Sequence, residues 1–158
     1  MLNQVEKKSV KWMRQAIALA HEAELNGEVP VGAVIVSKDD VVIGQGSNQM
    51  IDQHDPTAHA EVMAIRSACL AMNNYRLPET TLYVTLEPCL MCAGAIAHAR
   101  IERVVFAAFD PKRGAVHSCD HVMDKSYMHH VCRVEGGILS EECGKMLSDF
   151  FKQRRGGQ

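Results

Sequence analysis

TLYVTLEPCLMCAGAIAHARIERVVFA, residues 81–107, is the stretch that decides the fold. Its first six residues are mostly apolar or β-branched, which predicts a strand over 81–86. Pro88 follows where a helix should begin, and apolar residues then predict a helix over 89–99. A further β-branched run predicts a strand over 103–107. This strand, helix and strand in succession are typical of an α/β sheet.

The residues before this stretch add a helix, a hairpin and a second helix. Apolar residues recur at helical spacing over 8–26, and Gly27 closes that helix. Two apolar runs, 31–37 and 41–46, flank a short polar turn and predict a β-hairpin. A polar loop then leads into a helix over 58–72. We expect this helix to be buried along Val62, Ile65, Cys69 and Met72.

The residues after this stretch have weaker periodicity. Over 110–130 we expect mostly loop with short helical turns, then a short strand at 133–134 and a closing helix over 140–155. No linker or repeat divides the chain, so we expect one domain over 1–158, with a C-terminal helix and basic tail at about 140–158. Strands that alternate with helices predict an α/β sheet covered on both faces.

Composition excludes several classes of protein. The chain has 158 residues, 47% hydrophobic and 23% charged, which rules out collagen-like, disordered and coiled-coil chains. No apolar run approaches the ~18 residues of a membrane span. The first eight residues lack the apolar core of a secretory signal, so we expect a cytoplasmic protein with no membrane partner. Thiols stay reduced there, so the six cysteines indicate metal or catalytic chemistry before disulfides.

Three residues have the chemistry to hold one zinc ion. Cys89 and Cys92 are separated by two residues, a spacing that lets both thiolates reach one metal. His59 is the third candidate ligand, and the sequence places it in the first turn of its helix, as Cys89 is placed at the start of another. No fourth ligand suggests itself. Three protein ligands leave a position for water, as in catalytic rather than structural zinc sites.

Glu61 suits a catalytic carboxylate beside that metal. It lies about 200° around the helix from His59, so it is poorly placed to share the ion and better placed to move protons. Two other interpretations remain open: a thioredoxin-type redox pair at Cys89 and Cys92, and a closed structural zinc site. The first leaves His59 and Glu61 unexplained, and the second lacks a fourth ligand.

His59-Ala60-Glu61 followed by Pro88-Cys89-Leu90-Met91-Cys92 matches the H-x-E…P-C-x-x-C signature of zinc deaminases, of which tRNA adenosine deaminases are a standard example. The match extends to residues 28–34, 54–61 and 81–89 and covers roughly 10–155. The chain therefore resembles the bacterial tRNA-specific adenosine deaminases, within the zinc-dependent cytidine and deoxycytidylate deaminase superfamily. The resemblance implies a cytidine-deaminase-like three-layer α/β/α sandwich with a five-stranded mixed sheet, a homodimer and one Zn²⁺ per subunit.

The resemblance also implies a reaction. The substrate would be the wobble adenosine in a tRNA anticodon stem-loop, converted to inosine by hydrolysis. Zinc lowers the pKa of its bound water to about 7, so hydroxide becomes available to attack C6. Glu61 would be the proton shuttle, first to adenine N1 and then to the amino group that leaves as ammonia.

Further positions are carried over from the family as substrate contacts. Asn48 matches a base-contacting residue and the backbone N–H of Ala60 would bind the substrate edge, although Asn48 is also a common turn residue. Asp110 matches the loop beside the flanking nucleotide, where a carboxylate can accept a hydrogen bond from a ribose 2′-OH. The remaining matches are pocket-lining positions, of which the last two fit a plain strand core equally well: Glu28, Val31 and Leu86.

Charge placement bears on the RNA partner. The net charge of −2 argues against nucleic acid, but residues 145–158 hold four basic groups against one acidic group. Charge alone favours a solvated helix face there, and the family resemblance favours RNA. The extra histidines after residue 116 lack ligand spacing and are expected on the surface. The candidate RNA contacts are Lys112, Phe151, Lys152, Arg154 and Arg155.

Two functional alternatives remain. A deaminase of a free base or nucleotide, such as cytosine, guanine or deoxycytidylate, shares the zinc chemistry. A deaminase-like subunit that binds tRNA without catalysis typically lacks the shuttle carboxylate, and Glu61 is present here. The roles of four cysteines stay unassigned: Cys69, Cys119, Cys132 and Cys143.

Overall fold

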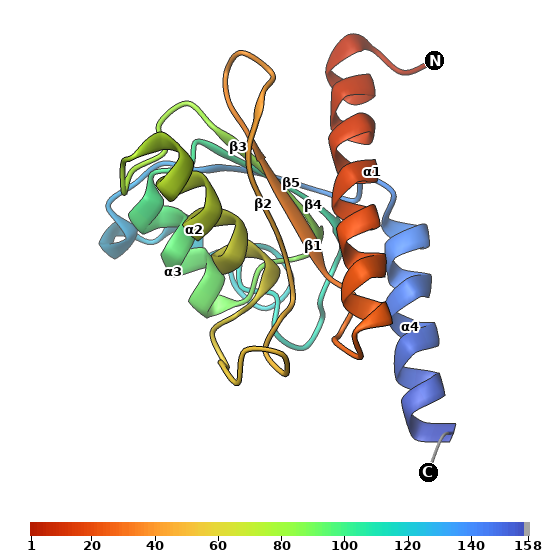
Figure 1. The fold of residues 1–158 in the computed structure, drawn as a ribbon. Coiled ribbons are helices and arrows are strands. Elements are labelled where there is room, and N and C mark those ends of the chain that lie inside the picture. Colours follow the sequence, from red (N-terminus) through yellow and green to blue (C-terminus); the bar gives the residue numbers. More distant parts are fainter. Residues whose placement is uncertain (157–158) are drawn as a thin grey trace.

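A mixed five-stranded sheet lies between two layers of helices in the computed structural model, which describes residues 1–156 (Figure 1). The five strands are β1 (Gly32–Val36), β2 (Val42–Ser47), β3 (Thr81–Leu86), β4 (Arg103–Ala108) and β5 (Arg133–Gly136). Their order is β2-β1-β3-β4-β5, with β1 antiparallel to β2 and β3. β4 runs parallel to both β3 and β5. The predicted mixed sheet is confirmed.

The helices form the outer layers. The pair drawn in red and blue in Figure 1 covers one face of the sheet, and the pair drawn in olive and green covers the other. Among residues 1–156 no helix combines the length and apolarity needed to cross a bilayer. The red and blue pair is α1 (Gln4–Leu25) and α4 (Ser140–Gly156), and the olive and green pair is α2 (Ala60–Met72) and α3 (Leu90–Ala99). Two 3₁₀ turns, η1 (Val122–Asp124) and η2 (Ser126–Met128), lie within the segment predicted to be mostly loop.

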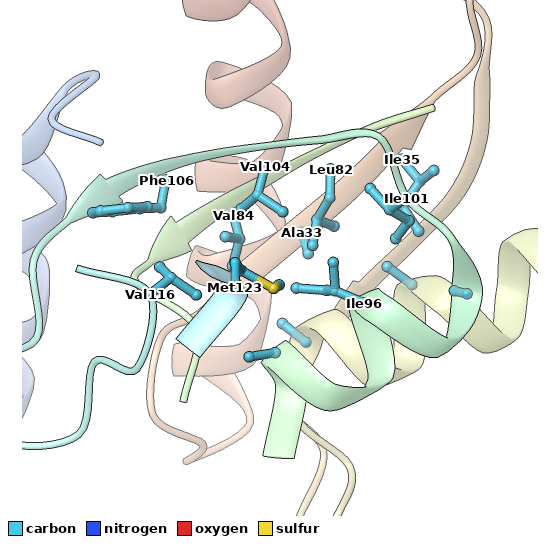
Figure 2. Close-up of a cluster of buried hydrophobic side chains, with 14 of the residues drawn as sticks. Ala33, Ile35, Leu82, Val84, Ile96, Ile101, Val104, Phe106, Val116 and Met123 are labelled. Atoms are coloured by element: carbon cyan, nitrogen blue, oxygen red, sulfur yellow. The ribbon is translucent and has the colours of Figure 1, made fainter. Parts of the chain in front are cut away.

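Alternate strand residues face opposite helical layers. Ala33 and Ile35 of β1 belong to the cluster packed against α2 and α3, whereas Val34 and Val36 belong to the cluster packed against α1. Figure 2 shows the first cluster, in which Ile96 of α3 lies against side chains from the sheet. Because the sheet is buried on both faces, its strands are almost continuously apolar, which is why the sequence reveals them.

The predicted element ends lie within two residues of the observed ones, except at the start of α1. That helix begins at Gln4, four residues before the predicted start at 8. The Asn3 side chain accepts from the Glu6 N–H at 2.8 Å, and the Glu6 carboxylate accepts from the Asn3 N–H at 2.9 Å. This reciprocal capping box extends the helix through residues that carry no apolar periodicity.

The buried face of α2 differs from the prediction. The side chains that α2 buries completely are small, apart from Glu61: Ala60, Ala64 and Ala68. The four residues predicted to be buried are not the buried set, since Val62, Ile65 and Cys69 are half-buried and Met72 is exposed.

Two glycines of β2 explain this difference. A Cβ on Gly44 would lie 2.6 Å from the Ala64 carbonyl oxygen, and one on Gly46 would lie 2.6 Å from the Ala60 carbonyl oxygen. The helix therefore lies directly on the strand backbone, where only alanine side chains fit. Helical periodicity alone cannot reveal such close contact, because the reason lies in another element.

We expect Gly44→Ala to lower the free energy of unfolding by about 1–3 kcal/mol, because the added methyl group overpacks the contact between β2 and α2. The matched control is Gly144→Ala in α4, where a Cβ meets nothing within 4 Å. That substitution should stabilise the protein by about 0.5–1 kcal/mol through helix propensity. Urea unfolding of both variants measures the two effects, and equal stability of the two variants would contradict the packing argument.

Candidate active site

Three candidate metal ligands meet where α2 and α3 begin. His59 is the N-cap of α2, Cys89 is the N-cap of α3, and Cys92 is the third residue of α3. His59 thus occupies the N-cap position without a capping hydrogen bond from its side chain, and it does not lie within the predicted first turn. Its Nδ1 is 3.7 Å from Cys89 Sγ and 3.5 Å from Cys92 Sγ. Among residues 1–156 no other group of three potential ligands is this close, so the extra histidines form no second site.

These distances fit a tetrahedral zinc site. A nitrogen and a sulfur ligand at about 2.0–2.1 Å and 2.3 Å from tetrahedral zinc lie about 3.5–3.6 Å apart. The observed separations of 3.5 and 3.7 Å are close to that value. One imidazole and two thiolates are also a ligand set that zinc prefers. The three residues therefore fit the metal that the sequence predicts.

The two thiols are joined by a hydrogen bond in this arrangement. A hydrogen bond from Cys92 lowers the pKa of Cys89 to about 3, and the same hydrogen bond, with burial, raises the pKa of Cys92. The hydrogen bond to Cys89 also raises the pKa of His59, although burial and the positive charge of Arg113 both act to lower it. A bound metal cation stabilises both thiolates at once, so this pair of thiols suits a metal.

Glu61 lies beside the ligand cluster but outside it. Its side chain is 4% exposed, and burial raises its pKa to about 7. The Cys92 thiol is within hydrogen-bonding reach of the carboxyl group. A buried carboxyl group that both accepts and donates a proton near neutral pH suits general acid and base work next to a metal.

Asn48 and Ala60 are joined by a hydrogen bond that the sequence does not predict. Asn48 Oδ1 accepts from the Ala60 N–H at 2.8 Å, and Asn48 Nδ2 donates to the Val29 carbonyl oxygen at 3.1 Å. Asn48 thereby satisfies one free N–H at the start of α2. The Ala60 N–H is occupied in this structure, whereas the family resemblance implies that it binds the substrate edge.

Glu28 holds the loop between β2 and α2. Its buried carboxylate accepts from the backbone N–H groups of Ile51, at 3.1 Å, and Asp52, at 2.9 Å. Val31 is buried in the core cluster and Leu86 is half-buried against both clusters. All three predicted pocket-lining residues therefore have structural contacts, and for Glu28 the contact is with backbone.

Glu87 lies near the metal ligands and was not predicted as a site residue from the sequence. Its side chain is 2% exposed and accepts from the N–H groups of Asp110, His117 and Ser118 and from the Ser118 hydroxyl. Burial alone would raise the pKa of Glu87, but these donors hold it below its usual range. The only signal in the sequence is an acidic residue at the end of an apolar strand, two residues before Cys89.

Comparison with known proteins decides the family. Residues 6–108 match the family described as the cytidine and deoxycytidylate deaminase zinc-binding region. A tRNA-specific adenosine deaminase of Haemophilus influenzae is 54% identical over 145 residues, which are 92% of this chain and 84% of the relative. The chain belongs to the tRNA-specific adenosine deaminases. Since deamination of this kind is a hydrolysis, this deaminase is a hydrolase.

Solved structures show the same fold. A structure from a study of A-to-I editing by tRNA:A34 deaminases is 44% identical to this deaminase, with a TM-score of 0.84 over 87% of this chain and 99% of that one. A guanine deaminase from Bacillus subtilis is 34% identical, with a TM-score of 0.62 over 98% of this chain and 95% of that one. The deaminase fold predicted from the sequence is confirmed.

Asp110 shapes its own loop in the deaminase. Its Oδ1 accepts from the backbone N–H groups of Lys112 and Arg113, both at 3.1 Å. The Asp110 carbonyl oxygen accepts from the Gly114 N–H at 2.9 Å. The Lys112 side chain is exposed. Lys112, a predicted RNA contact, therefore lies on the surface, and the Asp110 carboxylate stabilises a tight turn through its backbone hydrogen bonds.

The predicted RNA contacts of α4 differ in whether their side chains already make contacts within the protein. Lys152 and Arg155 are exposed, and the ring of Phe151 is 43% exposed. Arg154 instead donates to the Gly27 carbonyl oxygen beyond α1, and its guanidinium lies 4.9 Å from the centre of the Phe150 ring. Arg154 therefore ties α4 to the end of α1, a contact that charge counting does not reveal.

Proposed function

We propose that this deaminase converts the wobble adenosine of a tRNA anticodon to inosine by hydrolysis. The observation that carries the proposal is the buried Glu61 carboxyl group beside three ligands that fit an open zinc site. Family membership adds the substrate class, because the relatives that cover most of the chain are named for tRNA adenosine.

His59, Cys89 and Cys92 would hold the metal, with one zinc ion per chain. Bound zinc supplies a hydroxide nucleophile at neutral pH by lowering the pKa of water. Glu61 would take one proton from water and deliver it to N1 of adenine, and would then take the proton of the new C6 hydroxyl group and pass it to the amino group, which leaves as ammonia. Asn48 positions the start of α2, and it stays our candidate for base contact.

The test compares substrates for the same zinc-loaded protein. Inosine formation in a tRNA with adenosine at the wobble position is measured beside ammonia release from free guanine, cytosine, deoxycytidylate and adenosine. Free guanine is the alternative that a specific observation favours, since a guanine deaminase shares this fold at 34% identity. Faster turnover of guanine than of tRNA would replace our proposal with that alternative. A protein that binds tRNA without forming inosine would indicate a deaminase-like subunit.

We expect Asp110→Asn to lower the ratio of activity on RNA to activity on DNA by about tenfold, the value of one lost hydrogen bond to a ribose 2′-OH. Asparagine keeps an Oδ1 that accepts from Lys112 and Arg113, so the turn itself should survive. Single-turnover rates on matched RNA and DNA stem-loops measure the ratio. An unchanged ratio would remove Asp110 from sugar discrimination.

The tRNA would meet the basic end of α4 and the loop that carries Lys112. Lys152 and Arg155 are the most suitable phosphate contacts because both are exposed, and Phe151 offers an exposed ring for stacking. Arg154 is a weaker candidate, since it already holds Gly27.

A homodimer is the further part of this proposal. Large apolar side chains are exposed on or beside α2 and α3, the helices that begin at the metal ligands, and a second copy would cover them. We also expect the protein to act in the cytoplasm, where thiolate ligands stay reduced. The exposed apolar side chains on or beside these two helices are Leu70, Met72, Tyr75, Leu90 and Met91.

A further inference from the structure

We propose that Glu87 is a positioning residue for RNA, which holds the segment 109–119 in place beside the metal ligands. This inference rests on the proposed function, since it concerns how the tRNA substrate is held. Glu87 follows the last residue of β3 and lies two residues before Cys89. Its hydrogen-bond partners in that segment lie 23 to 31 residues further along the chain.

Four donors converge on the two carboxylate oxygens. Oε1 accepts from the Asp110 N–H at 3.1 Å and from the Ser118 hydroxyl. Oε2 accepts from the N–H groups of His117, at 2.9 Å, and Ser118, at 2.8 Å. A carboxylate has the lone pairs for four donors, whereas a glutamine has one oxygen and would turn two N–H groups toward the others. The site therefore requires a carboxylate.

Both ends of the segment depend on this one side chain. Asp110 lies at its start and His117 and Ser118 lie near its end, so Glu87 closes the segment into a loop. Gly114 lies so close to the carboxylate that a Cβ there would overlap it. The Ala115 N–H donates to the Pro88 carbonyl oxygen at 3.0 Å, which joins the middle of the loop to the residue before Cys89.

The loop presents its charged groups outward from this buried anchor. Lys112 and Arg113 are exposed, while Gly114 is buried beside the Glu87 carboxylate and Ala115 is buried in the core cluster. Glu87 itself is too buried to meet RNA. It acts through the loop, and its removal should displace the residues that touch substrate while leaving the ligand cluster intact.

The test begins with Glu87→Gln, with Glu22→Gln as the matched control on the exposed surface of α1. We expect zinc content to stay at that of the unsubstituted protein and kcat/KM on an anticodon stem-loop to fall about 10²-fold, mainly through KM. Ser118→Ala, which removes one donor, should change KM in the same direction by a smaller factor. The control should match the unsubstituted protein. A fall in kcat with KM unchanged would contradict the proposal.

A double-mutant cycle with Lys112→Ala separates positioning from general stability. If Glu87 acts through the loop, Lys112→Ala should raise KM by a larger factor in the unsubstituted protein than in Glu87→Gln. An equal factor in both backgrounds, including no effect in either, would overturn the proposal.

Amide hydrogen exchange distinguishes failure of this inference from failure of the proposed function. We expect faster exchange in Glu87→Gln within 109–119 and little change elsewhere, whether or not the protein acts on tRNA. Absence of inosine with the unsubstituted protein would refute the proposed function alone. Unchanged exchange in 109–119 would refute the role of Glu87.

Discussion

Glu61→Ala should lower inosine formation by at least about 10²–10⁴-fold while the protein still binds one zinc ion per chain. The Glu61 carboxyl group is buried beside the ligands but belongs to no metal-ligand group, so its loss removes proton transfer and leaves the metal. Zinc analysis and a single-turnover assay on the same sample measure both effects.

Glu61→Gln is the second variant for this prediction. It keeps the size of the side chain and removes its ability to carry a proton, so it should be as inactive as the alanine variant. If either variant kept more than a small fraction of the activity, Glu61 would not be the proton shuttle.

Cys92→Ala should lose both zinc and activity. Cys92 is fully buried and its sulfur lies 3.5 Å from His59 Nδ1, and among residues 1–156 the ligand group holds no thiol besides Cys89 and Cys92. With two ligands left, zinc should fall well below one ion per chain after dialysis against a weak chelator.

Cys143→Ala is the matched control for this loss. Cys143 is also a fully buried free thiol, but it lies in the cluster on the α1 face of the sheet. The control should keep its zinc and its activity. Stoichiometric zinc in Cys92→Ala would mean that the ligand set has been wrongly assigned.

The local signals in the sequence predicted much of the fold. β3, α3 and β4 are consecutive, Pro88 marks the start of α3, and the two strands are buried on both faces, so apolar spacing and one helix-start residue were sufficient to predict them. The buried face of α2 was predicted wrongly, because it depends on Gly44 and Gly46 in another element. Contacts between distant elements do not leave a periodic signal in either one.

The candidate site divides in the same way. The three ligands His59, Cys89 and Cys92 could be predicted from spacing and residue type, because a metal imposes both, and Glu61 followed from its position two residues after His59. The anchor role of Glu87 could not, because its partners are backbone N–H groups 23 to 31 residues away and any residue supplies such a donor.

Position-resolved inosine mapping tests whether this deaminase acts on the wobble adenosine. A tRNA with adenosine at the wobble position is incubated with the zinc-loaded protein, and inosine is then located along the whole tRNA by sequencing. We expect conversion at the wobble position, no conversion at the other adenosines, and none with Glu61→Ala. Zinc-loaded protein that leaves the wobble adenosine unchanged would contradict the proposed function.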